Sequence, residues 1–106
     1  MIKFEDFQKL DIKIGKVLSA ERIEGSDKLI KLKVDLGQEV RQIVAGIAQF
    51  YDPGYLLNKE LVILANLESR KLMGVESQGM VLAADVGGKP IILIPEKEIP
   101  PGSIVR

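Results

Sequence analysis

The sequence predicts an all-β protein with short helices, built around a five-stranded barrel. Apolar and polar residues alternate from Ile30 to Leu36, which is typical of a half-buried strand. Gly37-Gln38 supplies a hairpin turn into a returning strand at residues 40–47. Gly15 interrupts another strand that begins at Asp11, and a glycine inside a strand often marks a bulge or a bend. A strand bent in its middle can belong to both sides of a small closed barrel.

The other elements predicted in the first half of the sequence come directly before and after that bent strand. Phe4, Phe7 and Leu10 recur three residues apart, which predicts one or two turns of helix over residues 3–10. The period changes to two at Asp11, where the bent strand begins. A turn cluster at residues 24–28 then separates this strand from the strand at Ile30.

The second half of the sequence predicts a short helix, two buried strands and a hairpin. Asp52-Pro53 resembles an N-cap followed by proline at the first helical position, and this short helix stops near Asn58. Residues 61–67 and 80–84 are apolar on both faces, as in strands whose two faces are both covered. Gly87-Gly88 makes a second hairpin into residues 91–94, and a bent apolar tail follows.

This order of elements is the OB-fold pattern, five strands with a helix between the third and the fourth. We expect one domain over residues 1–106. The barrel occupies residues 11–85. An N-terminal helical turn (residues 1–10) and a C-terminal β-hairpin extension (residues 86–106) are expected to form dimer contacts.

Composition excludes several classes of function. The chain has no Cys and no His, so it lacks thiolate and imidazole metal ligands and the usual general base of a catalytic triad. We therefore expect no metal, no cofactor and a cytoplasmic location. No stretch approaches the roughly 20 apolar residues of a membrane span, so no membrane partner is expected.

The loop within residues 65–85, ANLESRKLMGVESQGMVLAAD, is the richest in functional groups. Ser77 lies between Gly74 and Gly79, but a nucleophile elbow needs the shorter spacing G-x-S-x-G. A phosphate-binding P-loop needs Lys and Ser or Thr after its second glycine, where this chain has Met80 and Val81. Both kinds of chemistry are therefore excluded.

The same loop would flank the binding face of an OB-fold. Such folds bind oligonucleotides on strands two and three, beside the loops that follow strands one and four. The chain has basic residues at these positions: Lys28, Lys31, Lys33, Arg41, Arg70 and Lys71. With only two Tyr, Tyr51 and Tyr55, stacking of successive bases is disfavoured, which favours recognition of folded RNA by shape.

Four segments resemble the structure-specific tRNA-binding domain found at the C-terminus of many methionyl-tRNA synthetases and in free-standing tRNA-binding proteins. They are FEDFQKLDIKIGKV (4–17), GSDKLIKLKVDLG (25–37), QIVAGIAQFYDP (42–53) and ANLESRKLMGVESQGMVLAA (65–84). The resemblance covers nearly the whole chain, including the closing KEIPPGSIV. It implies a dimeric OB-fold, with no chemistry of its own, that grips the outside corner of tRNA.

The resemblance also implies site residues. RNA contacts would come from Lys28, Lys31, Lys33, Asn66, Arg70, Lys71, Ser77 and Met80, with Gly74 and Gly79 shaping the loop. Plainer structural roles remain open for some of them. Lys31 and Lys33 would suit the solvated face of a strand. Met80 would suit a position in the core, where methionine often fills gaps. The hydroxyl of Ser77 would suit hydrogen bonds to backbone groups of the loop.

Apolar residues at both ends of the chain predict a homodimer, because a barrel of this size has limited interior. The predicted interface comprises Phe4, Phe7, Ile91, Ile92, Ile94, Ile99 and Ile104.

We therefore expect a non-catalytic domain that recognises the folded corner of tRNA by shape and phosphate contacts. Its partners would be tRNA, a second copy of the chain and the catalytic chain of methionyl-tRNA synthetase. One alternative is an export chaperone of the same fold, which binds unfolded peptides and shares the DF-KLDI opening but departs around the loop. Another is a small enzyme with paired carboxylates, Glu21 with Glu24 or Glu96 with Glu98, but neither pair lies in an apolar run.

Overall fold

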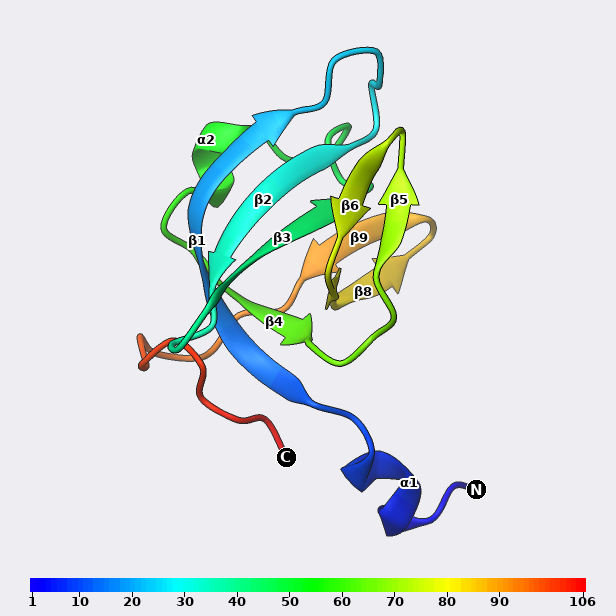
Figure 1. Cartoon of the computed structure of the whole chain (residues 1–106), viewed down its shortest axis with the longest axis vertical. Coiled ribbons are helices and arrows are strands. Elements are labelled where there is room, and N and C mark those ends of the chain that lie inside the picture. Colours follow the sequence, from blue (N-terminus) through cyan, green and yellow to red (C-terminus); the bar gives the residue numbers. More distant parts are fainter.

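The computed structural model describes residues 1–106. Its longest strand, β1 (Ile12–Arg22), pairs with two other strands. Its first half pairs antiparallel with β4 (Glu60–Leu64) and its second half with β2 (Ile30–Asp35). β2 pairs with β3 (Val40–Ala45), and β4 pairs with β7 (Met80–Val81). The five-stranded sheet has the order β3-β2-β1-β4-β7 and curls into a nearly closed barrel, in which β7 also lies near β3 (Figure 1). The predicted OB-like, all-β barrel is confirmed.

The bulge in β1 lies further along the strand than predicted. The pairing register shifts between Val17 and Ser19, not at Gly15. Gly15 serves close packing instead, because a Cβ at this position would lie 2.3 Å from Cγ1 of Val34 and 3.1 Å from Cγ1 of Ile63. The absence of a side chain therefore lets the inner side chains of β2 and β4 meet against β1.

Alternating side chains fill the barrel. Ile30, Leu32 and Val34 of β2 are fully buried, and Ile43 of β3 lies in the same cluster. Burial of this apolar cluster is the main force that holds the strands together.

The predicted helix between the third and fourth strands is α2 (Pro53–Leu56), whose Leu56 is fully buried in the barrel cluster. Asp52 occupies the N-cap position, but its side chain makes no capping hydrogen bond. Its carboxylate instead lies 3.2 Å from the guanidinium of Arg22.

The predicted functional loop contains a small hairpin of its own. β5 (Arg70–Leu72) and β6 (Val75–Ser77) are joined by Met73-Gly74. Both linking residues have positive φ, 52° and 77°, as a type I′ turn requires. Gly79 follows with φ 154°, and a Cβ there would lie 3.0 Å from the carbonyl of Leu64.

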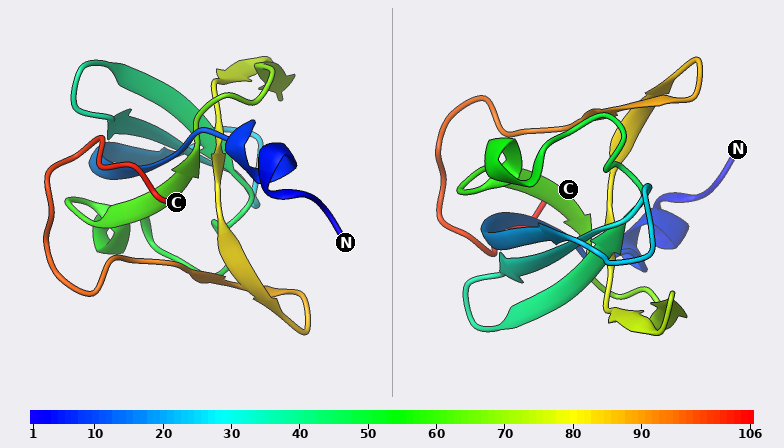
Figure 2. Two further views of the ribbon diagram at one scale, coloured as in Figure 1. Left: turned by 90° about the horizontal axis from the view of Figure 1, so that it is seen from below. Right: turned by 90° about the horizontal axis from the view of Figure 1, so that it is seen from above.

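A second hairpin, β8 (Ala83–Val86) and β9 (Lys89–Ile92), turns at Gly87-Gly88 as predicted. The prediction of one strand over residues 80–84 is wrong, because the strand breaks at Leu82. The chain pairs with β4 before this break and with β9 after it. Figure 2 shows the two hairpins projecting from different sides of the barrel.

The two ends of the chain differ in how they contact the barrel. The predicted N-terminal helix, α1 (Phe4–Gln8), buries none of its residues and projects away from the barrel (Figure 1). The tail lies along β1, where the N–H of Ile14 donates to the carbonyl of Ser103 and the N–H of Val105 donates to that of Ile12, both at 2.9 Å. Neither helix is long and apolar enough to cross a bilayer.

Candidate nucleic-acid interface

The outer surface of β2 carries two lysines side by side. Leu32 and Val34 point into the barrel, so the intervening Lys31 and Lys33 point outward. Lys31 Nζ donates to Oε1 of Glu21 on β1 at 2.8 Å. Lys33 Nζ donates to the side-chain carbonyl of Gln42 on β3 at 2.9 Å. Each lysine is therefore positioned by a neighbouring strand.

The β5–β6 hairpin folds against β3 (Figure 1), and Gln42 of β3 bonds both to Lys33 and to this hairpin. The hydroxyl of Ser77 accepts a hydrogen bond from the N–H of Val44 at 3.0 Å and donates to the carbonyl of Gly79 at 3.0 Å. The side-chain amide of Gln42 donates to the carbonyl of Glu76 at 2.8 Å. These bonds fix the position of the hairpin relative to the sheet.

Arg70 and Lys71 lie on opposite faces of this hairpin. Arg70 pairs across the strands with Ser77, and Lys71 pairs with Glu76. Partners in a cross-strand pair share one face, and neighbours along a strand alternate. Arg70 therefore lies on the face from which Ser77 contacts β3, and Lys71 lies on the outward face beside Glu76.

The loop between β1 and β2, residues 23–29, approaches the tip of the hairpin. Met73 Cε lies 3.8 Å from the position that a Cβ on Gly25 would take. Within the loop, the N–H of Lys28 donates to the hydroxyl of Ser26 at 3.3 Å, and its carbonyl accepts from the N–H of Ala48 at 2.9 Å. The backbone of Lys28 is thus held in place while the residue stays exposed.

Loop 23–29, the outer side of β2 and the hairpin together form one surface that we call the basic face. Its cationic residues are Lys28, Lys31, Lys33, Arg70 and Lys71.

Arg41 and Ser77, both predicted to contact RNA, are engaged within the protein. Arg41 donates from Nη1 to the carbonyls of Ala65 and Gln78, and its Nε pairs with Glu39. It thereby ties β3 to both ends of the segment that contains the hairpin. Ser77 is 3% exposed and has hydrogen-bond partners on both sides. This geometry favours support of the loop backbone over contact with a ligand.

Asn66 and Met80, two further predicted contacts, differ in what they offer a ligand. The side-chain carbonyl of Asn66 accepts from the N–H of Asp11 at 2.8 Å, and its amide donates to the carbonyl of Lys9 at 2.7 Å. Asn66 therefore joins the end of β4 to the segment that enters β1. Met80 on β7 is 43% exposed, so its side chain is not buried in the core, which was the plainer role left open for it.

Two polar residues beside the lysines of β2, Glu21 of β1 and Gln42 of β3, are absent from the predicted set of RNA contacts. Glu21 lies directly opposite Lys31, and Gln42 directly opposite Lys33. The hydrogen bond and the charge of Lys31, with a smaller contribution from Lys33, hold the pKa of Glu21 below its ordinary value. Strand register creates these contacts. The alternating pattern indicates only which residues face outward, so it does not identify partners on other strands.

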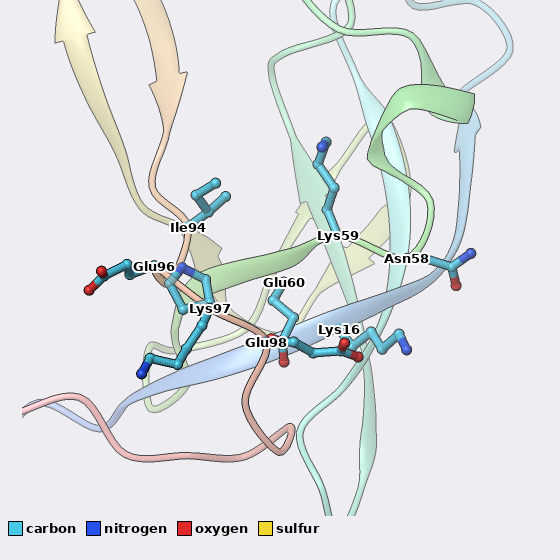
Figure 3. Close-up of a pocket in the computed structure, with 9 residues that line it drawn as sticks. Lys16, Asn58, Lys59, Glu60, Ile94, Glu96, Lys97 and Glu98 are labelled. Atoms are coloured by element: carbon cyan, nitrogen blue, oxygen red, sulfur yellow. The ribbon is translucent and has the colours of Figure 1, made fainter.

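A cavity of about 410 Å³ lies between the start of β4 and residues 94–98 (Figure 3). Its wall includes Glu60, which is 9% exposed. Glu60 Oε1 accepts from the N–H of Ile99 at 2.9 Å, whereas Oε2 is buried with no hydrogen-bond partner. Lys16 and Lys59 direct their amino groups away from Glu60 (Figure 3). We call residues 94–99 the strap, because this bond fastens them to β4.

The carboxylate pairs of the enzyme alternative gain no support from their surroundings. Glu96 and Glu98 are exposed on the strap, and Glu24 is exposed in loop 23–29. Glu21 is paired with Lys31. None of them lies in the apolar cleft that acid catalysis by a carboxyl group requires.

The residues of the predicted dimer interface fall into two groups. Four are exposed: Phe4, Ile91, Ile94 and Ile104. Three are partly buried: Phe7, Ile92 and Ile99. Ile92 packs against the barrel cluster, and its N–H donates to the hydroxyl of Tyr51 at 3.2 Å.

Comparison with known proteins agrees with the resemblance seen in the sequence. Residues 12–104 match the family described as "Putative tRNA binding domain". A methionine–tRNA ligase from Archaeoglobus fulgidus is 59% identical over 104 residues, covering 98% of this chain but 16% of that protein.

Two solved structures share the fold over the whole chain. A MetRS-related protein from Pyrococcus horikoshii matches with a TM-score of 0.96 and 40% identity, covering 100% of this chain and 98% of that one. The chaperone CsaA from Bacillus anthracis matches with a TM-score of 0.91 and 31% identity, covering 100% of this chain and 99% of that one. Because the family match takes in nearly every element described above, this chain belongs to the tRNA-binding domain family.

Proposed function

We propose that this chain is a non-catalytic module that binds the folded corner of tRNA through its basic face, by shape and phosphate contacts. The observation that carries this proposal is the grouping of cationic residues around β2 and the β5–β6 hairpin of a protein with zero net charge. A guanidinium such as that of Arg70 forks onto phosphate oxygens, and a lysine acts as a point charge toward them.

Recognition of a folded RNA fits this face better than stacking of single-stranded bases. None of the five aromatic residues of the chain lies in loop 23–29, on β2 or on the β5–β6 hairpin; they are Phe4, Phe7, Phe50, Tyr51 and Tyr55. Sequence-tolerant binding of single strands depends on aromatic platforms. A face of lysines and arginines suits phosphate and ribose groups whose spacing is fixed by RNA structure.

The module would serve methionyl-tRNA synthetase in the cytoplasm. Supporting this, the chain is similar to part of a methionine–tRNA ligase and to a MetRS-related protein. The catalytic chain of the synthetase would then be a partner, either as part of the same polypeptide or as a separate subunit.

The test is a titration of the chain with fluorescent tRNA at several salt concentrations. About four to six phosphate contacts give a slope of roughly 3 to 5 when log Kd is plotted against log salt. Binding to folded tRNA should exceed binding to an unstructured RNA of equal length. A flat salt response, or equal binding of the two RNAs, would refute the proposal.

A second candidate is a chaperone that binds unfolded peptides, because CsaA shares the fold at 31% identity. An unfolded peptide added to the same titration separates the two functions. A peptide-binding chaperone needs an exposed apolar surface, and its binding should change little with salt. Tight, salt-insensitive binding of the peptide without binding of tRNA would favour the chaperone.

A further inference from the structure

Among the cationic residues of the basic face, Lys31 is the one whose amino group contacts a carboxylate. Its Nζ lies 2.8 Å from Oε1 of Glu21. Lys33 is held by the neutral amide of Gln42 instead, at 2.9 Å. The ion pairs of the chain include none of the other three, Lys28, Arg70 and Lys71. Among the acidic residues on and beside this face, Glu21 is thus the one whose carboxylate pairs with one of its cations.

Strand register places this carboxylate there. Glu21 lies directly opposite Lys31 in the antiparallel pairing of β1 with β2. The side chain of Glu21 is 66% exposed, whereas that of Lys31 is 31% exposed. An anion that approaches Lys31 from solvent therefore meets the negative charge of Glu21 beside its target. The lysines also lower the pKa of Glu21, so the carboxylate stays ionised at neutral pH.

We propose that Glu21 is an internal competitor for RNA phosphate, which occupies Lys31 in the free protein and must be displaced when tRNA binds. This inference rests on the proposed function, because it concerns the same face. A phosphate and the Glu21 carboxylate compete for one ammonium group. Each phosphate contact made at Lys31 therefore replaces an existing ion pair, and its net gain is smaller than at an unpaired lysine.

The consequence is that Glu21 sets the affinity of the module below the value that its lysines alone would give. Lys31 contributes less to the salt dependence than the other cations, since its charge is already compensated in the free protein. Binding of tRNA through Lys31 is accompanied by release of the Glu21 carboxylate.

The experiment compares Glu21→Gln with wild type in tRNA titrations over a range of salt concentrations. Glutamine keeps the size and the acceptor oxygen and removes only the charge. We expect tRNA affinity to rise about two- to fivefold, the range for one exposed ion pair. The salt slope should rise by about one, because Lys31 then binds as a free cation. In a Lys31→Met background, Glu21→Gln should lose most of this effect, because only its weaker influence on Lys33 then remains.

A matched control removes one negative charge elsewhere. Asp85 of β8 is exposed and makes no ion pair, and its hairpin projects from a different side of the barrel than the β5–β6 hairpin (Figure 2). Asp85→Asn keeps the acceptor for the N–H of Gly88 and should leave tRNA affinity unchanged. An equal gain in Asp85→Asn would overturn the proposal in favour of a general charge effect.

Unchanged or weaker binding by Glu21→Gln would also overturn it, since Glu21 would then merely orient Lys31 or contact RNA itself. In that case wild-type tRNA binding still stands, so the failure is separate from that of the proposed function. If wild type binds no tRNA, the proposed function fails and this inference fails with it.

Discussion

Arg41 and Lys31 are cations on adjacent strands that differ in what holds them. The Arg41 guanidinium donates to two backbone carbonyls and pairs with Glu39. Lys31 contacts one carboxylate on the adjacent strand. Replacing Arg41 leaves carbonyl groups of the loop without a donor, whereas replacing Lys31 leaves an exposed carboxylate in water. A substitution at Arg41 therefore perturbs the fold before it tests binding.

The pleat of the β5–β6 hairpin predicts unequal roles for its two adjacent cations. Arg70→Glu should weaken tRNA binding by about tenfold or more, because Arg70 lies on the face directed toward the sheet. Lys71→Glu should weaken binding less, by about threefold or below, because Lys71 lies on the outward face. Both residues are exposed, so melting temperatures should stay near wild type.

Fluorescence titration and thermal denaturation of the two variants check this prediction. Equal losses of affinity would show that RNA reaches both faces of the hairpin. Unfolding of Arg70→Glu would instead give Arg70 a structural role.

Residue types on the basic face could be predicted from the sequence, but their partners could not. Alternation along β2 indicates that Lys31 and Lys33 face outward. The bonds that occupy Ser77 and Asn66 reach partners 33 and 57 positions away in the chain. No local pattern encodes contacts over such separations. The RNA contacts expected of these two residues rest on the family resemblance, which does not identify these internal hydrogen-bond partners.

For whole elements, the sequence predicts where strands occur better than it predicts which strands pair with each other. The apolar run at residues 80–84 indicates burial, but it does not say which strand lies beside it. The structure divides this run between β7, which pairs with β4, and β8, which pairs with β9. The tail was likewise expected at a dimer interface because it is apolar. Its backbone bonds to β1 depend on where β2 leaves the edge of β1 free.

The strap gives a stability prediction centred on Glu60. Its Oε1 holds the N–H of Ile99, while its buried Oε2 has no hydrogen-bond partner. Glu60→Gln keeps an acceptor for Ile99 and removes a buried charge, so the free energy of unfolding should rise by about 1 kcal/mol. Glu60→Ala removes the acceptor, so this free energy should fall by about 1 to 2 kcal/mol. Urea denaturation measures both.

A loss of stability in Glu60→Gln would contradict this account. It would mean that the charge of Glu60 has a partner in solution, and Lys16 is the candidate because it lies directly opposite in the β1–β4 pairing.

The whole molecule presents surfaces of different chemistry at its two ends. Loop 23–29 of the basic face lies at one end, and α1 and the C-terminus lie at the other (Figure 1). At the second end, Phe4 of α1 is 71% exposed and Ile104 of the tail is 59% exposed. The rings of Phe4 and Phe7 stack on each other, with centroids 6.4 Å apart, but α1 buries no residue in its own chain. Exposed apolar groups of this kind favour an interface with a second copy.

We therefore expect a homodimer at micromolar concentration, formed through Phe4, Ile104 and the other exposed members of the predicted interface. The double variant Phe4→Asp, Ile104→Asp should sediment as a monomer, because it places charges within the contact. Its melting temperature at low concentration should change little, since both side chains are exposed. Binding of tRNA should weaken, because a dimer offers a second basic face to a tRNA already bound at the first.

Leu57→Asp provides the matched control. Leu57 follows α2 and is 45% exposed, but it lies outside both chain-end extensions, so this variant should remain dimeric. Truncation before Glu96 should also abolish the dimer, yet it removes the tail that bonds to β1 and the strap residue that bonds to Glu60. Loss of the dimer after truncation therefore combines an interface effect with a folding effect. Sedimentation of the full-length chain as a monomer at micromolar concentration would refute the dimer, and a dimeric double variant would place its interface elsewhere.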